Sequence, residues 1–151
     1  MVEGEMIPDA TLTDAGGAVP LRSLVGRKAV VYFYPKDDTS GCTREAQDFT
    51  ALMPEFEAAG VAVAGVSKDS VASHGKFTAK HQLGVRLLSD ESGAACEAFG
   101  TWIEKSMYGK KYMGIDRATF LFDAEGRLAQ AWRKVKVPGH AEAVLKAARD
   151  L

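Results

Sequence analysis

The sequence predicts a single α/β domain in which helices flank a central mixed β-sheet. Its 151 residues, 46% of them hydrophobic, suit one domain that buries its own core. Two apolar runs at 28–34 and 61–66 are rich in β-branched or aromatic residues and predict buried strands. Two later runs, 118–122 and 128–132, flank a turn-rich spacer and predict an antiparallel hairpin. Strand–helix–strand units followed by a hairpin predict a mixed sheet with helices on both faces.

A short hairpin is expected ahead of the first buried strand. The extended stretch Ile7–Leu12 leads into the turn-forming residues Asp14–Gly17. This segment therefore predicts an N-terminal β-hairpin extension to the main sheet.

A helix is predicted to begin near Cys42, directly after the first buried strand and a polar loop. Apolar residues recur there at steps of three and four, at Phe49, Leu52, Phe56 and Ala59. Pro54 removes a backbone donor, so we expect it to kink this helix or divide it near Met53. Gly60 should end the helix as a C′ glycine.

The second half of the chain predicts alternating strands and helices. After the strand at 61–66, Asp69–His81 should be helical, with Ser70 or Asp69 as its cap. Leu87–Leu88 should be extended. Ser92–Phe99 is Ala-rich and predicts a short helix, which Gly100 should close.

A last helix should follow Gly139. Its expected inner face consists of Ala143, Val144, Ala147 and Ala148. The complete order of elements is that of a thioredoxin-like fold, although periodicity alone does not separate it from other small α/β folds.

Charge and cysteine content exclude several classes of protein. The net charge is −1 at pH 7, so no basic excess points to nucleic acid or an anionic membrane as a partner. Residues 1–5 contain no apolar stretch of the kind found in secretory signals. Two cysteines do not make a disulfide scaffold. We therefore expect a cytoplasmic protein.

Cys42 is the strongest candidate for a reactive group. It follows the polar loop 35–41 and is expected in the first turn of the helix. The unpaired N–H groups and the positive dipole end of a helix favour a negative sulfur there. Because the thiolate is the nucleophilic form of cysteine, this setting favours a reactive thiol over a buried filler.

The spacing Pro35-x-x-x-Thr39-x-x-Cys42 strongly resembles that of the peroxiredoxins. Gly41–Ala46 and Met113–Phe120 extend the resemblance to the peroxiredoxin Q branch, also called bacterioferritin comigratory proteins. The similarity covers nearly the whole chain. It implies a thioredoxin-fold thiol peroxidase that reduces hydrogen peroxide and organic hydroperoxides without a metal or an organic cofactor.

The resemblance also implies roles for individual residues. Cys42 would attack the peroxide and become a sulfenic acid. The Thr39 hydroxyl would approach the sulfur and the peroxide, Arg117 would stabilise the thiolate and hold the peroxide, and Pro35 would shield the sulfur from water. Taken singly, Thr39 could be a helix cap, Arg117 a surface charge and Pro35 a strand end. Glu45 could either suit the helix dipole or orient Arg117.

The second sulfur leaves two mechanisms open. Many members of the branch carry a resolving cysteine five residues after the first, where this chain has Gln47, and none lies in 70–81. Cys96 in the Ala-rich segment is better explained as a buried structural residue. A one-cysteine cycle is then favoured, with an external thiol such as thioredoxin, glutaredoxin or glutathione as reductant. The alternative is a two-cysteine cycle with Cys96 as the resolving residue.

Other readings carry less weight. A peroxide sensor that does not cycle would need the same reactive Cys42. A disulfide reductase is disfavoured because no C-x-x-C motif is present. The family branch suggests a monomer or a weak dimer.

Several further side chains are expected to have ordinary roles. His74 and His81 should be exposed to solvent, His140 has no evident partner, and Arg133 should be solvated. The aromatic residues Trp102, Tyr108 and Tyr112 could wall the peroxide pocket or pack in the ordinary way.

Overall fold

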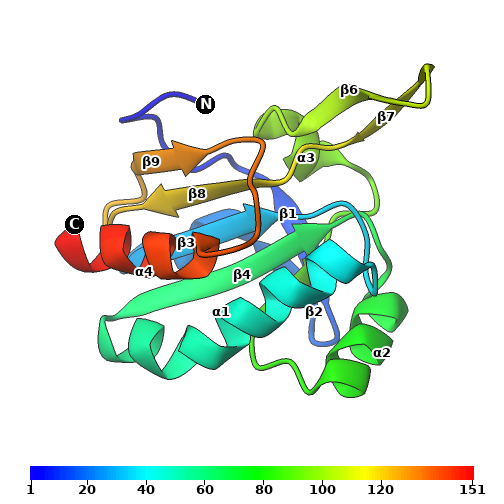
Figure 1. Ribbon diagram of the computed structural model, residues 1–151. Helices are drawn as coiled ribbons and strands as arrows, with labels where there is room; N and C mark the ends of the chain where they lie inside the picture. Colours follow the sequence, from blue (N-terminus) through cyan, green and yellow to red (C-terminus); the bar gives the residue numbers. More distant parts are fainter.

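The computed structural model describes residues 1–151 and shows a seven-stranded mixed sheet with helices against both faces (Figure 1). The elements are, in chain order, β1 (Thr11–Asp14), β2 (Gly17–Pro20), the 3-10 helix η1 (Leu21–Leu24), β3 (Lys28–Phe33), α1 (Ser40–Ala58), β4 (Val61–Ser67), α2 (Val71–His81), β5 (Arg86–Ser89), α3 (Ala94–Ala98), β6 (Trp102–Met107), β7 (Lys110–Ile115), β8 (Ala118–Phe122), β9 (Leu128–Trp132) and α4 (His140–Asp150). No helix has both the length and the apolar character needed to cross a membrane.

The strand order is β2-β1-β5-β4-β3-β8-β9, which confirms the predicted mixed sheet and its N-terminal hairpin. β3, β4 and β5 run parallel, because α1 and α2 return the chain between them. β8 pairs antiparallel with β3, and β9 pairs antiparallel with β8. The carboxyl end of β3 therefore lies beside the start of β8, although the two are far apart in sequence.

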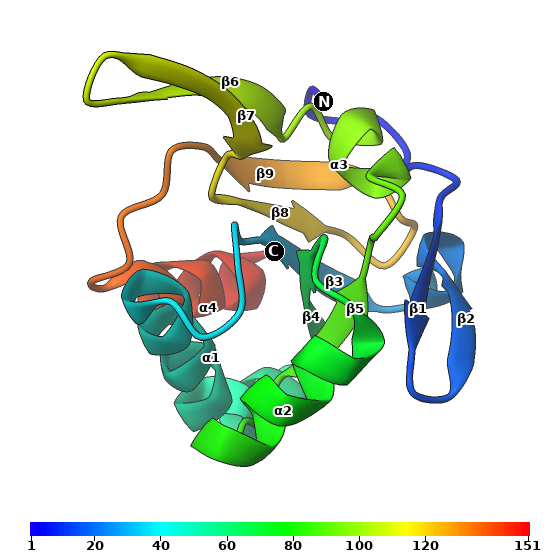
Figure 2. The ribbon, with the colours of Figure 1, turned by 90° about the vertical axis from the view of Figure 1, so that its right-hand side faces the viewer.

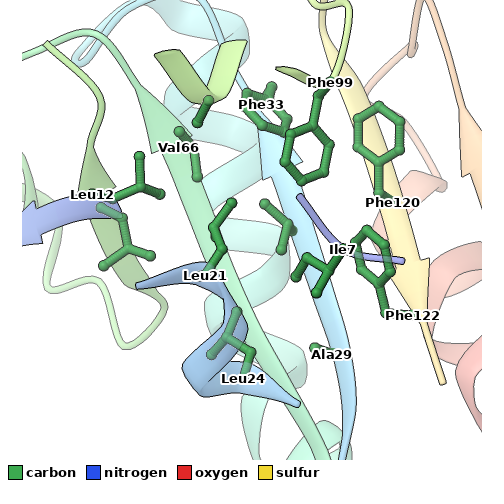
Figure 3. Close-up of a cluster of buried hydrophobic side chains, with 14 of the residues drawn as sticks. Ile7, Leu12, Leu21, Leu24, Ala29, Phe33, Val66, Phe99, Phe120 and Phe122 are labelled. Carbon is green, nitrogen blue, oxygen red and sulfur yellow. The ribbon is translucent and has the colours of Figure 1, made fainter. Parts of the chain in front are cut away.

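Two apolar cores lie on opposite faces of this sheet. Val30 and Tyr32 of β3 face α1, α2 and α4, whereas Val31 and Phe33 face α3, η1 and the N-terminal segment. Figure 2 shows the three longer helices together on one side of the sheet. Figure 3 shows the other core, where Phe33 and several further aromatic rings gather over β3 and β8.

Packing on the helical face holds α1 to the sheet. Tyr32 on β3 pairs in register with Gly65 on β4. A methyl group at Gly65 would lie only 2.6 Å from the Tyr32 ring, so glycine provides the space the ring occupies. The Tyr32 ring in turn stacks on Phe49 of α1, with 4.6 Å between ring centroids. The position of α1 therefore depends on a glycine in β4.

The structure corrects three expectations about the elements. α1 runs unbroken through Pro54, so the predicted division of this helix is wrong, and a kink stays a prediction. Phe49 and Phe56, on either side of Pro54, are fully buried and anchor both halves of the helix. On α4, Ala143 is exposed, whereas Leu145 is buried. The segment 102–115, for which no element was expected, forms the β6–β7 hairpin.

The β6–β7 hairpin projects from the body of the domain in both ribbon views (Figures 1 and 2). Its side chains are mostly exposed, so no apolar face gives it a period of two in the sequence. This lack of patterning explains why the sequence did not predict it.

We predict that Gly65→Ala destabilises the domain by about 2 kcal/mol or more, because the added methyl group overlaps the buried Tyr32 ring. Gly75→Ala in α2 is the matched control, since nothing lies within 4 Å of the added methyl group. The control should stabilise the protein by about 0.5–1 kcal/mol through helix propensity. Urea unfolding of both variants tests this, and equal free energies of unfolding would contradict it.

Candidate active site

Cys42 lies in the first turn of α1, as the sequence predicted. Thr39 is the N-cap residue, with an extended backbone, and its carbonyl accepts the first helical hydrogen bond from the Thr43 N–H at 2.8 Å. The backbone N–H groups of Gly41 and Cys42 donate to no carbonyl of the chain. These free donors and the positive end of the helix dipole both favour negative charge at this turn.

Arg117, which lies between β7 and β8, contacts the Cys42 sulfur. Its Nη2 donates to Cys42 Sγ at 3.3 Å, and its Nη1 donates to Glu45 Oε1 at 2.7 Å. The contact follows from the sheet register, in which Phe33 at the end of β3 faces Ala118 at the start of β8. The guanidinium therefore links two side chains of α1 to the segment that precedes β8.

The space for this guanidinium depends on Gly41. A methyl group there would lie 3.2 Å from Arg117 Nη2, which is closer than ordinary van der Waals contact. A side chain at this position would require the guanidinium to shift by a few tenths of an ångström. A glycine next to the nucleophile is therefore part of the site geometry, which the sequence pattern contained but did not explain.

The structure pairs Glu45 with Arg117, one of the two roles that the sequence left open for this residue. The carboxylate is buried and paired with Arg117, and its second oxygen has no hydrogen-bond partner. Burial raises the pKa of Glu45 to about 7, against the opposing effect of the Arg117 charge. Burial by itself lowers the pKa of Arg117, but Glu45 and Cys42 outweigh it and raise that pKa above its ordinary value. The arginine stays charged at the sulfur.

Thr39 and Pro35 lie in the loop before Cys42, but neither is in contact with the sulfur through a hydrogen bond. The Thr39 hydroxyl donates to the Lys36 carbonyl at 2.9 Å and caps no N–H group of the helix. Thr39 is exposed to solvent. Pro35 is half-buried and lines a cavity together with Trp102 and Tyr112. Tyr108, by contrast, lies at the tip of the hairpin with 98% of its surface exposed.

Arg133 is exposed, as the sequence suggested, but it also bonds to the segment that precedes Arg117. Its Nε donates to Asp116 Oδ2 at 3.1 Å, and its Nη2 donates to the Gly100 carbonyl at 2.5 Å. The backbone N–H of Lys134 donates to the same carboxylate at 3.2 Å. These bonds fix Asp116, and so the backbone of its neighbour Arg117, at the edge of the site.

A second polar cluster anchors the loop 35–41, which we call the cysteine loop. It includes His74, which is buried and not exposed as the sequence predicted. The Asp37 carboxylate accepts hydrogen bonds from the Tyr34 hydroxyl at 2.6 Å and the Ser73 hydroxyl at 2.8 Å. His74 Nε2 lies 2.8 Å from the Ser67 hydroxyl and 3.7 Å from Asp37. Burial lowers the pKa of His74 and raises that of Asp37. The cluster ties the loop to β4 and α2.

The other two histidines also have partners. His140 is buried, with its Nε2 at 2.8 Å from the Thr119 hydroxyl, and burial lowers its pKa to about 4. His81 is half-buried and pairs with Asp38 at 2.8 Å. Partners that lie on other elements cannot be inferred from sequence spacing.

Cys96 is buried in the core opposite to that of Cys42. Cys42 packs in the core beneath α1, whereas Cys96 packs beneath α3 on the other face of the sheet. Both cysteines are free. Burial raises the pKa of Cys96 to about 12, and hydrogen bonding to Asp90 acts in the same direction. Cys96 is therefore a neutral thiol at pH 7, with the sheet between it and Cys42.

Comparisons with known proteins place this geometry in a family. Residues 4–131 match the model of the AhpC/TSA family. The curated relative Peroxiredoxin Bcp from Xanthomonas campestris is 54% identical over 140 residues, which cover 92% of this chain and 88% of the relative.

Two solved structures show the same fold. The bacterioferritin comigratory protein of Xanthomonas campestris has a TM-score of 0.90 at 50% identity, covering 97% of this chain and 96% of the other. A cysteine mutant of the peroxiredoxin Q of Xylella fastidiosa has a TM-score of 0.93 at 39% identity, covering 99% and 96% of the two chains. These likenesses confirm the thioredoxin-like fold. The chain belongs to the AhpC/TSA family, in its peroxiredoxin Q (Bcp) branch.

Proposed function

We propose that the protein reduces hydrogen peroxide and small organic hydroperoxides through a one-cysteine cycle at Cys42. As a peroxiredoxin it is a thiol-dependent peroxidase. The work on the Xanthomonas campestris structure concerns alkyl peroxide reduction, which supports organic hydroperoxides as substrates here. The observation that carries the proposal is the 3.3 Å contact between Arg117 Nη2 and Cys42 Sγ.

The Arg117–Cys42 contact supplies what the first step requires. The positive guanidinium and the free N–H groups of the first helical turn favour the thiolate. The thiolate attacks one peroxide oxygen and the O–O bond breaks. The departing oxygen takes a proton and leaves as water or an alcohol, and Cys42 becomes a sulfenic acid. The guanidinium and the N–H groups also stabilise the charge that develops on the departing oxygen.

Thr39 would orient the peroxide. Its hydroxyl hydrogen is donated to the Lys36 carbonyl, so the oxygen lone pairs remain free to accept a hydrogen bond. A hydroperoxide O–H could donate to them from the open side of the loop. Pro35, half-buried beside the cavity, would limit the access of water to the sulfur.

The second step would use an external thiol. Cys96 is buried on the other face of the sheet, and no disulfide joins it to Cys42. A thiol of the thioredoxin, glutaredoxin or glutathione class would attack the sulfenic acid and release water. A second thiol would then restore Cys42. We further propose a cytoplasmic protein that acts as a monomer or weak dimer.

Arg117→Met should lower kcat/KM for hydrogen peroxide by about 10²–10³-fold, because the charge that stabilises the thiolate and the departing oxygen is lost. Arg44→Met is the matched control, since this exposed arginine of α1 pairs only with Asp48. The control should retain activity, and Cys42→Ser should set the background rate. Peroxide consumption with excess dithiothreitol measures all three. An Arg117→Met variant as fast as the control would refute the proposed role.

Cys96→Ser should retain peroxidase turnover with an external thiol, although it will lower stability because it places a hydroxyl in an apolar core. Cys96→Ala separates the two effects, since it removes the sulfur without adding a polar group. Mass spectrometry after one equivalent of peroxide should find no intramolecular Cys42–Cys96 disulfide. Loss of turnover in both variants, with the fold intact by circular dichroism, would instead establish the two-cysteine cycle.

The ionisation of Glu45 should make stability depend on pH. Its pKa is raised from 4.5 to about 7 in the folded protein, so the folded state binds the proton more tightly than the unfolded chain does. The resulting stabilisation is present below pH 4.5 and is lost as pH rises through about 7. Relative to Glu45→Gln, the wild type should therefore lose up to about 3 kcal/mol between pH 4.5 and pH 8.5.

Urea unfolding of both proteins at these two pH values measures that difference. Glu57→Gln, which changes an exposed carboxylate of the same helix, should shift the free energy of unfolding equally at both pH values. A difference between wild type and Glu45→Gln that does not vary with pH would contradict the assignment.

A further inference from the structure

A cavity of about 380 Å³ opens beside the cysteine loop, between that loop and the β6–β7 hairpin. Its walls combine aromatic and apolar side chains with lysines, and the lining residues are Pro35, Lys36, Lys68, Trp102, Lys105, Tyr112, Met113, Gly114 and Ile115. This volume is within the range of small-molecule sites. The peroxidase step does not require such a cavity for hydrogen peroxide.

The charge of the cavity is one-sided. Lys36, Lys68 and Lys105 all line it, and no carboxylate does. None of these three lysines forms an ion pair, although other lysines of the chain do. Lys68 Nζ lies 4.0 Å from the centroid of the Trp102 ring, so its only close partner in the cavity is aromatic. Three unpaired cations around one cavity attract an anion.

The cavity also lies beside the two segments that carry Cys42 and Arg117, although neither residue lines it. Pro35 belongs to the loop that leads to Cys42, and Ile115 lies two residues before Arg117. Lys105 is partly buried, which lowers its pKa, and it interacts with the charges of Asp116, Arg117 and Cys42. A ligand held by these lysines would therefore lie beside the loop that leads to Cys42.

We propose that this lysine-lined cavity binds the carboxylates of a small anionic thiol and presents its sulfur to the oxidised Cys42. The proposal rests on the one-cysteine cycle and names the chemical class of its reductant. The lysines would hold the carboxylates, and Trp102 and Tyr112 would contact the apolar part of the molecule. The one-cysteine cycle needs this thiol because Cys96 lies on the other face of the sheet.

The chemistry balances with two molecules of thiol. The first attacks the sulfenic acid, forms a mixed disulfide with Cys42 and releases water. The second attacks the sulfur of the bound thiol, restores the Cys42 thiol and leaves as the symmetrical disulfide. The oxidant in this sequence is the peroxide that produced the sulfenic acid.

A series of small thiols that differ in charge tests the proposal. With saturating hydrogen peroxide, we expect kcat/KM to be higher for mercaptosuccinate than for neutral 2-mercaptoethanol, and lowest for cationic cysteamine. The advantage of mercaptosuccinate should decrease as sodium chloride is raised from 0.02 to about 0.5 M, because salt screens the lysines. Equal values for the three thiols at low salt would overturn the proposal.

The double variant Lys36→Gln/Lys68→Gln removes two of the cavity charges. It leaves Lys105 unchanged, because the charge of Lys105 interacts with Cys42. We expect it to lower the ratio of kcat/KM for mercaptosuccinate to that for 2-mercaptoethanol about tenfold. Lys110→Gln/Lys111→Gln is the matched control, since it removes the same number of charges from exposed positions of the β6–β7 hairpin, outside the cavity. The control should keep the wild-type ratio, and an equal loss in both double variants would overturn the proposal.

A carboxylate-bearing hydroperoxide could use the same lysines, so the oxidation step is measured separately. The loss of the Cys42 thiol is followed with linoleic acid hydroperoxide and with neutral cumene hydroperoxide, without any reductant. If Lys36→Gln/Lys68→Gln slows only the reaction with the charged hydroperoxide, the cavity binds the substrate and the proposal is wrong. If no thiol sustains turnover in the wild type, the one-cysteine cycle fails, and this proposal fails with it.

Discussion

The placement of one guanidinium between a sulfur and a carboxylate organises this end of the molecule. Arg117 contacts Cys42 at 3.3 Å and Glu45 at 2.7 Å, across 75 and 72 residues of sequence. The pairing of β3 with β8 brings these groups together, Gly41 leaves the space, and Arg133 fixes the backbone on the far side. The position of the cation beside the sulfur therefore depends on contacts from several elements.

This arrangement is energetically expensive and therefore informative. A buried ion pair costs desolvation energy that an apolar contact of similar size would not. Glu45 has one carboxylate oxygen without a partner, and burial raises its pKa to about 7. A buried carboxylate with a raised pKa and an unpaired oxygen is typical of functional sites, where groups are positioned for chemistry and not for maximal stability. The pair gives Arg117 a fixed orientation that a flexible surface arginine would lack.

The two cysteines lie on opposite faces of the sheet. Cys42 and the polar groups around it lie on the face covered by the longer helices, and Cys96 lies in the aromatic core of the other face. The same residue type therefore lies at a helix start beside an arginine in one place and in an apolar core in the other. The β6–β7 hairpin adds a lysine-lined cavity beside the loop that leads to Cys42.

Local patterns in the sequence determined most of the elements and the place of Cys42 in the first turn of α1. Buried strands, helix starts and turns are encoded by periodicity and by residues near one another along the chain. The β6–β7 hairpin lacked such a pattern because both of its faces meet solvent. The partners of Glu45, His74 and Arg133 were decided only by the tertiary structure. Each of these contacts joins elements that the sheet brings together, and spacing along the chain does not report distance across a sheet.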